Sequence, residues 1–432
     1  MSPFHLLSCL RNFFLFGLCF PLCLPAQSLV KGQILDDSTR KPVAYARVMI
    51  YGSDVGTLSN GEGQFLLKIP TELSNAAYLE IFCLGYEDKR IPLPEQGEQI
   101  TTLLKVAPLD MAVVTIYSET AEGLLEKAIE RIPDNFSNSP QRWEAFYRES
   151  QEWKLRELTT PEDTLRKQRE VSIGEALVEA YLPSYEKGKD AQVKLLKGRL
   201  IRGENSPMDS INQGFAGVIE SFEPKGGAPG QINFDIARHP RDFDFLDKKA
   251  SKRYEFKLRG LIRQGSQALY LIDFLQRTEV EERNSMLDGK ILLDSATLAF
   301  VSLEYGLSPE ASGYTPRLGM MGMKMKGLDY RYRLDYQKLN GRWQLRYCQQ
   351  YTSLYIGIPN GFMGQELTLD SRLNLRSELL FTQGLSVNAE PIPREERMLK
   401  KERFSEEASE YDPEFWGERQ IMPLEENLAE QR

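Results

Sequence analysis

The sequence predicts a mainly β protein in which an N-terminal β-sandwich is followed by a large antiparallel sheet, with few helices. Three observations favour this fold class. Residues 29–106 hold short alternating runs separated by polar and glycine-rich turns, which is typical of a sandwich. Residues 142–381 hold longer alternating runs joined by short turns, which is typical of an antiparallel sheet. Between them, residues 121–132 carry apolar side chains at helical spacing.

Length and composition indicate a folded chain of several domains. Hydrophobic residues make up 41% and charged residues 27% of 432 residues, which are globular values on a chain too long for one core. The net charge of -8 gives no electrostatic help in binding phosphate backbones. We therefore expect two or three domains and no nucleic-acid partner.

Residues 1–26 have the features of a signal peptide. Arg11 and the amino terminus supply positive charge, residues 13–24 form a short apolar run, and Ala26 offers a small residue for cleavage. No later segment is long and apolar enough to span a bilayer as a helix. We expect an exported protein, in the periplasm or associated with the outer membrane, with no transmembrane span in the mature chain.

The sandwich is expected over residues 27–107. Its clearest strands are residues 33–35, 44–51, 64–69, 78–84 and 99–105. Val48 and Phe65 are expected to face its core. Gly56 and Gly63 flank a hairpin that needs positive φ or a close backbone approach.

Four phrases in this region carry a family resemblance. They are Gly32-Gln-Ile-Leu-Asp36, Pro42-Val43-x-x-Ala46-x-Val48, Gly56-Thr57-x-Ser59-Asn60-x-x-Gly63-x-Phe65 and Leu84-Gly85-Tyr86. In this order they resemble the carboxypeptidase-regulatory-like domain. The resemblance implies a transthyretin-like, seven-stranded β-sandwich that serves exported proteins as an accessory module. It does not imply peptidase activity.

Residues 108–140 are expected to form a linker with one helix, over residues 121–132, which Pro133 ends. The sheet domain is expected over residues 141–382, with Asn340-Gly341 and Asp288-Gly289 as hairpin turns. Its clearest strands are residues 143–153, 171–181, 193–200, 253–263, 268–276, 289–293, 299–305, 330–338, 343–355 and 366–380. Residues 203–249 are interpreted as an insertion with one or two helices that covers the sheet.

A second, looser resemblance concerns this sheet domain. Ile132-Pro133-Asp134-Asn135-Phe136, Phe146-Tyr147-Arg148-Glu149 and Gly289-Lys290-Ile291-Leu292-Leu293-Asp294 are similar to phrases of exported Gram-negative envelope proteins that begin with this sandwich. In those proteins the following region is similar to lipoprotein carriers. This implies a curved half-barrel with a helix against its concave face. Residues 383–432 are expected to form a charged C-terminal tail, whose aromatic residues at 411–416 dock back onto the main domain.

Few residues are suited to catalysis. His239 is the one histidine left after signal removal, which is too few for the zinc site of true carboxypeptidases. The carboxylate pairs Glu149 with Glu152 and Glu175 with Glu179 are interpreted as solvent-facing strand residues. We therefore expect no enzymatic activity and no cofactor.

Other candidate ligands have simpler interpretations. Asp54, Asn60 and Glu62 offer oxygens for calcium, but turn chemistry explains Asn60 without a metal. Cys83 and Cys348 lie far apart in sequence and are expected to be buried and unpaired, although a disulfide stays open in an oxidising compartment. We expect no metal site.

A methionine-rich segment is the most unusual local feature. Met321, Met323 and Met325 alternate with Gly322 and Lys324, as residues on one face of a strand do. Methionine fills adaptable apolar surfaces and can also bind Cu(I). We favour an apolar groove lined by these three residues.

The sequence thus predicts a non-catalytic envelope protein with a binding or scaffolding role. In its more specific form, the second domain holds an apolar envelope molecule. Two alternatives remain, namely glycan or peptide binding through the sandwich loops, and a hydrolase. The partner is expected to be an envelope protein, a lipid or a glycan, and its identity stays open.

Overall fold

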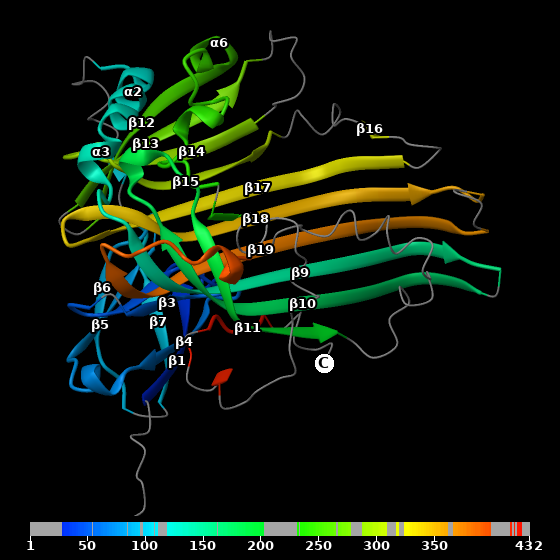
Figure 1. The fold of residues 1–432 in the computed structure, drawn as a ribbon, viewed down its shortest axis with the longest axis horizontal. Coiled ribbons are helices and arrows are strands. Elements are labelled where there is room, and N and C mark those ends of the chain that lie inside the picture. Colours follow the sequence, from blue (N-terminus) through cyan, green and yellow to red (C-terminus); the bar gives the residue numbers. More distant parts are fainter. Residues whose placement is uncertain are drawn as a thin grey trace, which may run out of the picture.

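The computed structural model describes most of the chain after the expected signal segment. The described residues are 28–53, 55–83, 85–95, 98–107, 109–110, 119–161, 163–202, 231–232, 234–264, 267–277, 287–308, 317–318, 324–361, 366–398, 415–416, 419 and 421–425. Over these residues the protein is mainly β, with two small sheets packed beside one large sheet (Figure 1). No helix in this part of the chain is long and apolar enough to cross a membrane.

The two small sheets form the predicted sandwich of seven strands. One sheet has the order β4-β1-β7, with strands β1 (Ser28–Asp36), β4 (Gln64–Ile69) and β7 (Gln99–Leu104). The other has the order β3-β2-β5-β6, with strands β2 (Arg47–Ile50), β3 (Gly56–Leu58), β5 (Tyr78–Phe82) and β6 (Lys89–Pro92). Strands β3 and β6 were not expected, because three and four residues are too few to show alternation.

The sandwich core follows the sequence pattern. Val48 and Phe65 are both buried in one apolar cluster with Ile34 and Leu67, which confirms their expected orientation. Gly63 has φ +72°, in the left-handed region that favours glycine. A Cβ at Gly56 would lie 2.7 Å from the Val48 carbonyl oxygen, so this glycine allows a close backbone approach.

Two helices follow the sandwich where one was expected. Helix α2 (Ala121–Glu130) begins at Thr120, whose hydroxyl accepts a hydrogen bond from the Gly123 amide at 3.1 Å. Pro133 does not end this helix. It lies in the first turn of α3 (Ile132–Asn135), where proline is tolerated because the amide of that position has no helical partner.

Within the described residues, the large sheet has twelve strands and is not closed. Its order is β11-β10-β9-β19-β18-β17-β15-β14-β13-β12-β8, with β16 also paired to β17. The strands are β8 (Leu109–Asp110), β9 (Gln141–Thr159), β10 (Thr164–Leu182), β11 (Gln192–Arg202), β12 (Tyr254–Gln264), β13 (Gln267–Gln276), β14 (Leu287–Asp294), β15 (Phe300–Leu307), β16 (Arg317–Leu318), β17 (Lys324–Leu339), β18 (Arg342–Ile358) and β19 (Thr368–Val387). All ten expected strands belong to this sheet, and its neighbouring strands run antiparallel.

Of the two expected hairpin turns, one is confirmed and one is wrong. Asn340 and Gly341 join β17 to β18 with φ +50° and +82°, as an Asn-Gly turn requires. Asp288 and Gly289 lie inside β14, where Gly289 pairs with Phe274 and Tyr305. A Cβ at Gly289 would lie 2.6 Å from the Phe274 ring, so tight side-chain packing, not a turn, accounts for this glycine.

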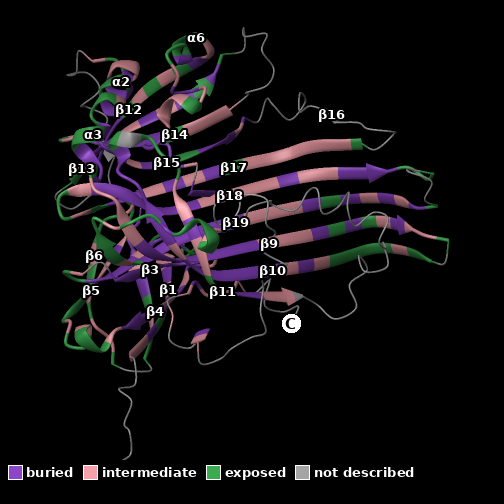
Figure 2. Cartoon of the chain, viewed as in Figure 1, coloured by how far each residue is buried: buried purple, intermediate pink, exposed green. Residues whose placement is uncertain are grey.

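The two faces of the large sheet pack against different partners. On β9, Ala145 and Tyr147 enter the main apolar core, while Phe146 between them enters a separate cluster with Leu58 of the sandwich. Since neighbouring residues of a strand point to opposite faces, the sandwich covers the face opposite the main core. Figure 2 shows burial concentrated where the long strands pass between the sandwich and the helices.

The protein's own side chains fill the main-core face. Helix α2 packs there, together with residues 234–253, which include η5 (Pro240–Asp242) and α6 (Ala250–Arg253). Ile236 and Phe245 from this segment are both buried. The insertion expected at residues 203–249 thus covers the sheet in its described part, and residues 203–230 lie outside the described residues. Cys348 is buried on this face and Cys83 in the sandwich, and no disulfide joins the two, as expected.

Candidate binding seam between the sandwich and the large sheet

A row of charged side chains crosses the large sheet on the face toward the sandwich. Neighbouring strands contribute directly paired residues, and the charges alternate in sign apart from one glutamine. The row is Arg199, Glu175, Arg148, Glu378, Gln349, Arg333, Glu304, Lys290, Asp273 and Lys257. Opposite charges directly across antiparallel strands attract each other, so the row is consistent with the observed strand register.

The two halves of this row differ in exposure. From Arg199 to Glu378 it is buried beneath the sandwich and the C-terminal segment. From Glu304 to Lys257 it lines an open groove of about 560 Å³. We call the buried part, together with the chain segments that cover it, the seam.

Glu175 on β10 is the centre of the seam. It is fully buried, and its Oε1 accepts hydrogen bonds from Arg148 Nε at 2.8 Å and Nη2 at 2.6 Å. Its Oε2 accepts from Arg199 Nε at 2.7 Å. Burial alone would raise the pKa of Glu175, but the two guanidinium groups outweigh burial and lower that pKa, so the side chain is ionised at neutral pH.

The expected solvent exposure of the carboxylate pairs is wrong for two residues. Glu175 is 0% exposed, and Glu149 is buried with its Oε2 accepting from the Tyr147 hydroxyl at 2.6 Å. Glu152 and Glu179 are half-buried and ion-paired with arginines. The expectation assumed that one face of the sheet is exposed to solvent, whereas both faces are covered along this part of β9 and β10.

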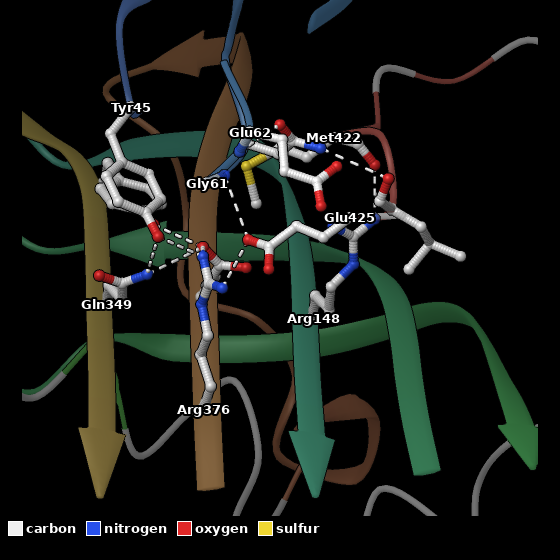
Figure 3. Close-up of polar contacts among 12 residues, drawn as sticks. Tyr45, Gly61, Glu62, Arg148, Gln349, Arg376, Met422 and Glu425 are labelled. Carbon is white, nitrogen blue, oxygen red and sulfur yellow. Dashed lines mark hydrogen bonds and ion pairs between the residues drawn. The ribbon is translucent and has the colours of Figure 1, made fainter. Parts of the chain in front are cut away.

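The C-terminal segment lies in the seam and is held by its main-chain carbonyls. Arg148 donates from Nη2 to the Met422 carbonyl at 2.5 Å and from Nη1 to the Pro423 carbonyl at 3.1 Å (Figure 3). Lys68 of β4 donates to the Trp416 carbonyl at 2.9 Å and also to that of Arg419. The sandwich and the large sheet therefore both donate hydrogen bonds to the same segment.

Two apolar side chains anchor this segment. Trp416 is 2% and Met422 is 1% exposed, and both pack in the cluster that contains Leu58 of the sandwich and Tyr347 of β18. The Arg199 guanidinium lies 4.5 Å from the centre of the Trp416 ring, a cation–π geometry. This confirms the docking interpretation for Phe415 and Trp416, whereas residues 411–414 lie outside the described residues.

Glu425 connects the sandwich turn to β19. Its Oε1 accepts from the Gly61 amide at 3.1 Å and from Arg376 Nη1 at 2.6 Å, as Figure 3 shows. Arg376 also donates to Glu378 at 2.9 Å. Asn60 in the same turn points its Nδ2 at the Leu424 carbonyl oxygen, 3.4 Å away.

Tyr45 docks the sandwich directly onto the sheet. Its hydroxyl accepts from Gln349 Nε2 at 3.0 Å and from Arg376, and its ring stacks on Tyr347 with 5.8 Å between centroids. Its backbone has φ +59°, a conformation that costs a residue other than glycine about 1 kcal/mol. The surrounding contacts hold it there, which marks Tyr45 as a docking residue.

The expected site residues lie elsewhere. Met325 is half-buried on β17, paired with Ile356, in an apolar cluster near the far ends of the long strands. Met321 and Met323 lie outside the described residues, so the apolar groove stays a prediction. His239 precedes η5, with Nε2 3.4 Å from an Asp190 oxygen.

The candidate calcium ligands serve another purpose in the described part of the chain. Asn60 Oδ1 accepts from the amides of Glu62 and Gln64, which is turn chemistry, and Asp54 lies outside the described residues. Among the described residues, no group of three or more His, Cys, Asp and Glu could hold a metal ion.

Sequence reasoning missed most of the seam. Arg148, Glu175, Arg199 and Lys68 look like ordinary polar positions of alternating strands, and nothing local distinguishes them. The tryptophan near the C-terminus was the one available signal, because a large aromatic residue in a charged tail needs a partner.

Residues 30–116 match the family model of the CarboxypepD_reg-like domain. The sandwich is a domain of this family. The match covers nearly all of β1 to β7 and agrees with the resemblance carried by the Gly32, Pro42 and Gly56 phrases. No curated protein matches the chain.

Solved structures show distant likenesses. One is a DUF1329 family protein from Desulfovibrio piger, with 13% identity, coverage of 62% of this chain and 96% of that chain, and a TM-score of 0.19. Another is MucB in complex with MucA(peri), with 9% identity, coverage of 60% and 94%, and a TM-score of 0.19. A third is a putative membrane-associated protein of unknown function from Bacteroides fragilis, with 10% identity, coverage of 83% and 99%, and a TM-score of 0.14. With TM-scores this low, no functional argument rests on them.

Proposed function

We propose that this protein is an exported, non-catalytic binding or scaffolding protein of the Gram-negative envelope, and that its seam is a binding site for a peptide segment. The observation that carries the proposal is the capture of main-chain carbonyls by Arg148 from the sheet and Lys68 from the sandwich. Such contacts bind main-chain carbonyls whatever the side chains are, and the Trp416 and Met422 positions add side-chain selection.

In the absence of a partner, the chain's own C-terminal segment occupies this site. It bridges both domains, since Glu425 contacts Gly61 of the sandwich and Arg376 of β19. Because it belongs to the same chain, the C-terminal segment has an effective concentration of about a millimolar. It therefore holds the sandwich against the sheet and competes with peptides of other proteins. A partner peptide displaces it when it fills the same two apolar positions better.

The electrostatics at the centre of the seam, around Glu175 and Glu378, favour binding over hydrolysis. A glycosidase needs one carboxyl group with a raised pKa to act as a general acid. Burial raises the pKa of Glu175 and of Glu378, but neighbouring arginines outweigh burial and lower both. Carboxylates that stay ionised and are saturated by arginine suit a docking site.

An apolar cargo finds less support. The face expected to hold it is filled by the protein's own Ile236 and Phe245, packed on Phe274 and Tyr305. The remaining support for a lipid is the cluster around Met325, near the far ends of the long strands. Export and an envelope location are supported by the signal-like first 26 residues and by the CarboxypepD_reg-like domain.

The test weakens the docking of the chain's own C-terminal segment and then adds that segment as a separate peptide. The full mature chain carrying Trp416→Ala and Met422→Ala is titrated against a fluorescent peptide of residues 411–425, and binding is followed by anisotropy. We expect saturable binding, at least about tenfold tighter than to the wild-type chain, whose own segment competes.

A peptide with both anchors replaced by alanine is the control, and it should not bind. If the folded double variant did not bind the wild-type peptide, the proposed peptide-binding role would be refuted. Turnover of a peptide, ester or glycan by the pure protein would refute the non-catalytic role.

A further inference from the structure

A second cleft lies between the sandwich and the large sheet. Its volume is about 660 Å³, which is within the range of small-molecule sites. Its walls include Arg47 and Phe82 of the sandwich and Gln337, Val301 and Trp343 of the sheet domain. None of the described residues of the C-terminal segment 415–425 lines it, so the cleft is separate from the seam.

Arg47 is an arginine without a polar partner. Among the described residues no hydrogen bond or ion pair reaches its guanidinium, which lies 4.8 Å from the centre of the Phe82 ring. Burial lowers the pKa of Arg47, and Asp335, Asp88 and Glu80 oppose this effect only in part. A partly buried charge without a partner is destabilising, so a bound partner would explain its presence.

Neighbouring arginines on the same interface each have at least one polar partner. Arg333 donates to Asp335 at 2.9 Å, and Arg346 donates to the Gly56 carbonyl at 3.1 Å. Arg90, on the rim of the cleft, pairs with Glu80 at 2.5 Å. The isolation of Arg47 is therefore a local property of the cleft and not of the whole interface.

Two neutral groups in the wall of the cleft also lack partners. Gln337 is 1% exposed, and neither its Oε1 nor its Nε2 makes a hydrogen bond within the described chain. The Trp343 indole Nε1 has none either. The unmet groups are thus mostly donors, with one acceptor among them. The complementary molecule presents mainly acceptor oxygens and at least one donor.

We propose that this cleft binds a small polar molecule that carries a carboxylate. The Arg47 guanidinium donates a bidentate pair of hydrogen bonds to this carboxylate. A planar guanidinium matches a carboxylate in this way. Lys89, Arg90 and Lys338 also line the cleft, together with Glu80 and Asp88, and beside these two carboxylates a single negative charge is repelled less than the nearly two charges of a phosphate. Gln337 and Trp343 then contact the polar body of the molecule, as an acidic sugar or an acidic amino acid offers.

Isothermal titration calorimetry of the full mature chain tests the proposal. The probes are sodium glucuronate for an acidic sugar, L-glutamate for an acidic amino acid, methyl glucoside as a neutral analogue, and inorganic phosphate. We expect saturable binding of one of the two acids, no binding of methyl glucoside, and weaker binding of phosphate. Which acid binds identifies the source of the carboxylate.

Two variants locate the binding. Arg47→Met should weaken binding at least tenfold without lowering the melting temperature, because it removes a charge that has no partner. Arg90→Met, a matched change on the rim, should alter binding less than twofold. Equal binding by Arg47→Met and wild type, no binding of either acid, or tighter binding of phosphate would each overturn the proposal.

Discussion

Replacing Glu175 with glutamine tests whether the buried charges hold the seam together. The substitution keeps the side chain's shape but removes the charge that two arginines share. Breaking a buried ion pair by removing one partner costs about 3–5 kcal/mol. Arg148 keeps its carbonyl contacts and Arg199 keeps the Trp416 ring, so we expect the lower end, about 3 kcal/mol.

The assay is equilibrium urea unfolding followed by circular dichroism. The matched control is Glu157→Gln on the same sheet, whose partner Arg166 is 68% exposed, and a surface pair of this kind contributes about 0–1 kcal/mol. If Glu175→Gln changed the free energy of unfolding by no more than the control, the seam would be held by apolar contacts alone and the electrostatic argument would fail.

Three further predictions concern the same elements. The pKa values of Glu175 and Glu378 are lowered in the folded state, so their contribution to stability is complete above the ordinary value of 4.5 and is lost as pH falls below it. Unfolding at pH 5 and pH 3 should show this loss in the wild type and a smaller one in Glu175→Gln. Trp416→Ala should cost about 3 kcal/mol of docking energy and speed proteolytic removal of the C-terminal segment at least tenfold, whereas an unchanged cleavage rate would contradict the anchor. Gly63→Ala should destabilise the sandwich by more than about 2 kcal/mol, because a Cβ would meet the Ile34 carbonyl as well as strained backbone. Gly52→Ala, also at positive φ but with open space around it, should cost about 1 kcal/mol, and thermal unfolding of both variants measures the difference.

Much of the fold could be predicted because its signals are local. Alternation along β17, where Tyr332 and Leu334 are buried and Arg331 is exposed, follows from the geometry of one strand. The Asn340-Gly341 turn needs only two residues that accept positive φ. The errors came where a local signal has two physical meanings. Proline marks a helix start as well as a helix end, as Pro133 shows. A glycine such as Gly289 serves close packing as well as turns.

The candidate site could not be predicted, because its residues meet only through long-range pairing. Arg148 and Glu175 are 27 residues apart, and Arg148 and Pro423 are 275 apart. Strand register decides such meetings, since a slip of one residue would turn Glu175 to the other face. Glu175 is buried because the sandwich and the C-terminal segment cover its face of the sheet, which alternation alone predicts to be exposed to solvent.

The sequence by itself determined most of the strands, many of their inward-facing residues, the Asn340-Gly341 turn and the family of the sandwich, because each depends on neighbours along the chain. Only the tertiary structure decided which charges align across the sheet. It also decided which of them are buried, and that Arg47 faces a cleft without a partner. Those properties depend on the packing of one domain against another, and packing partners distant in sequence leave no periodic mark on either segment.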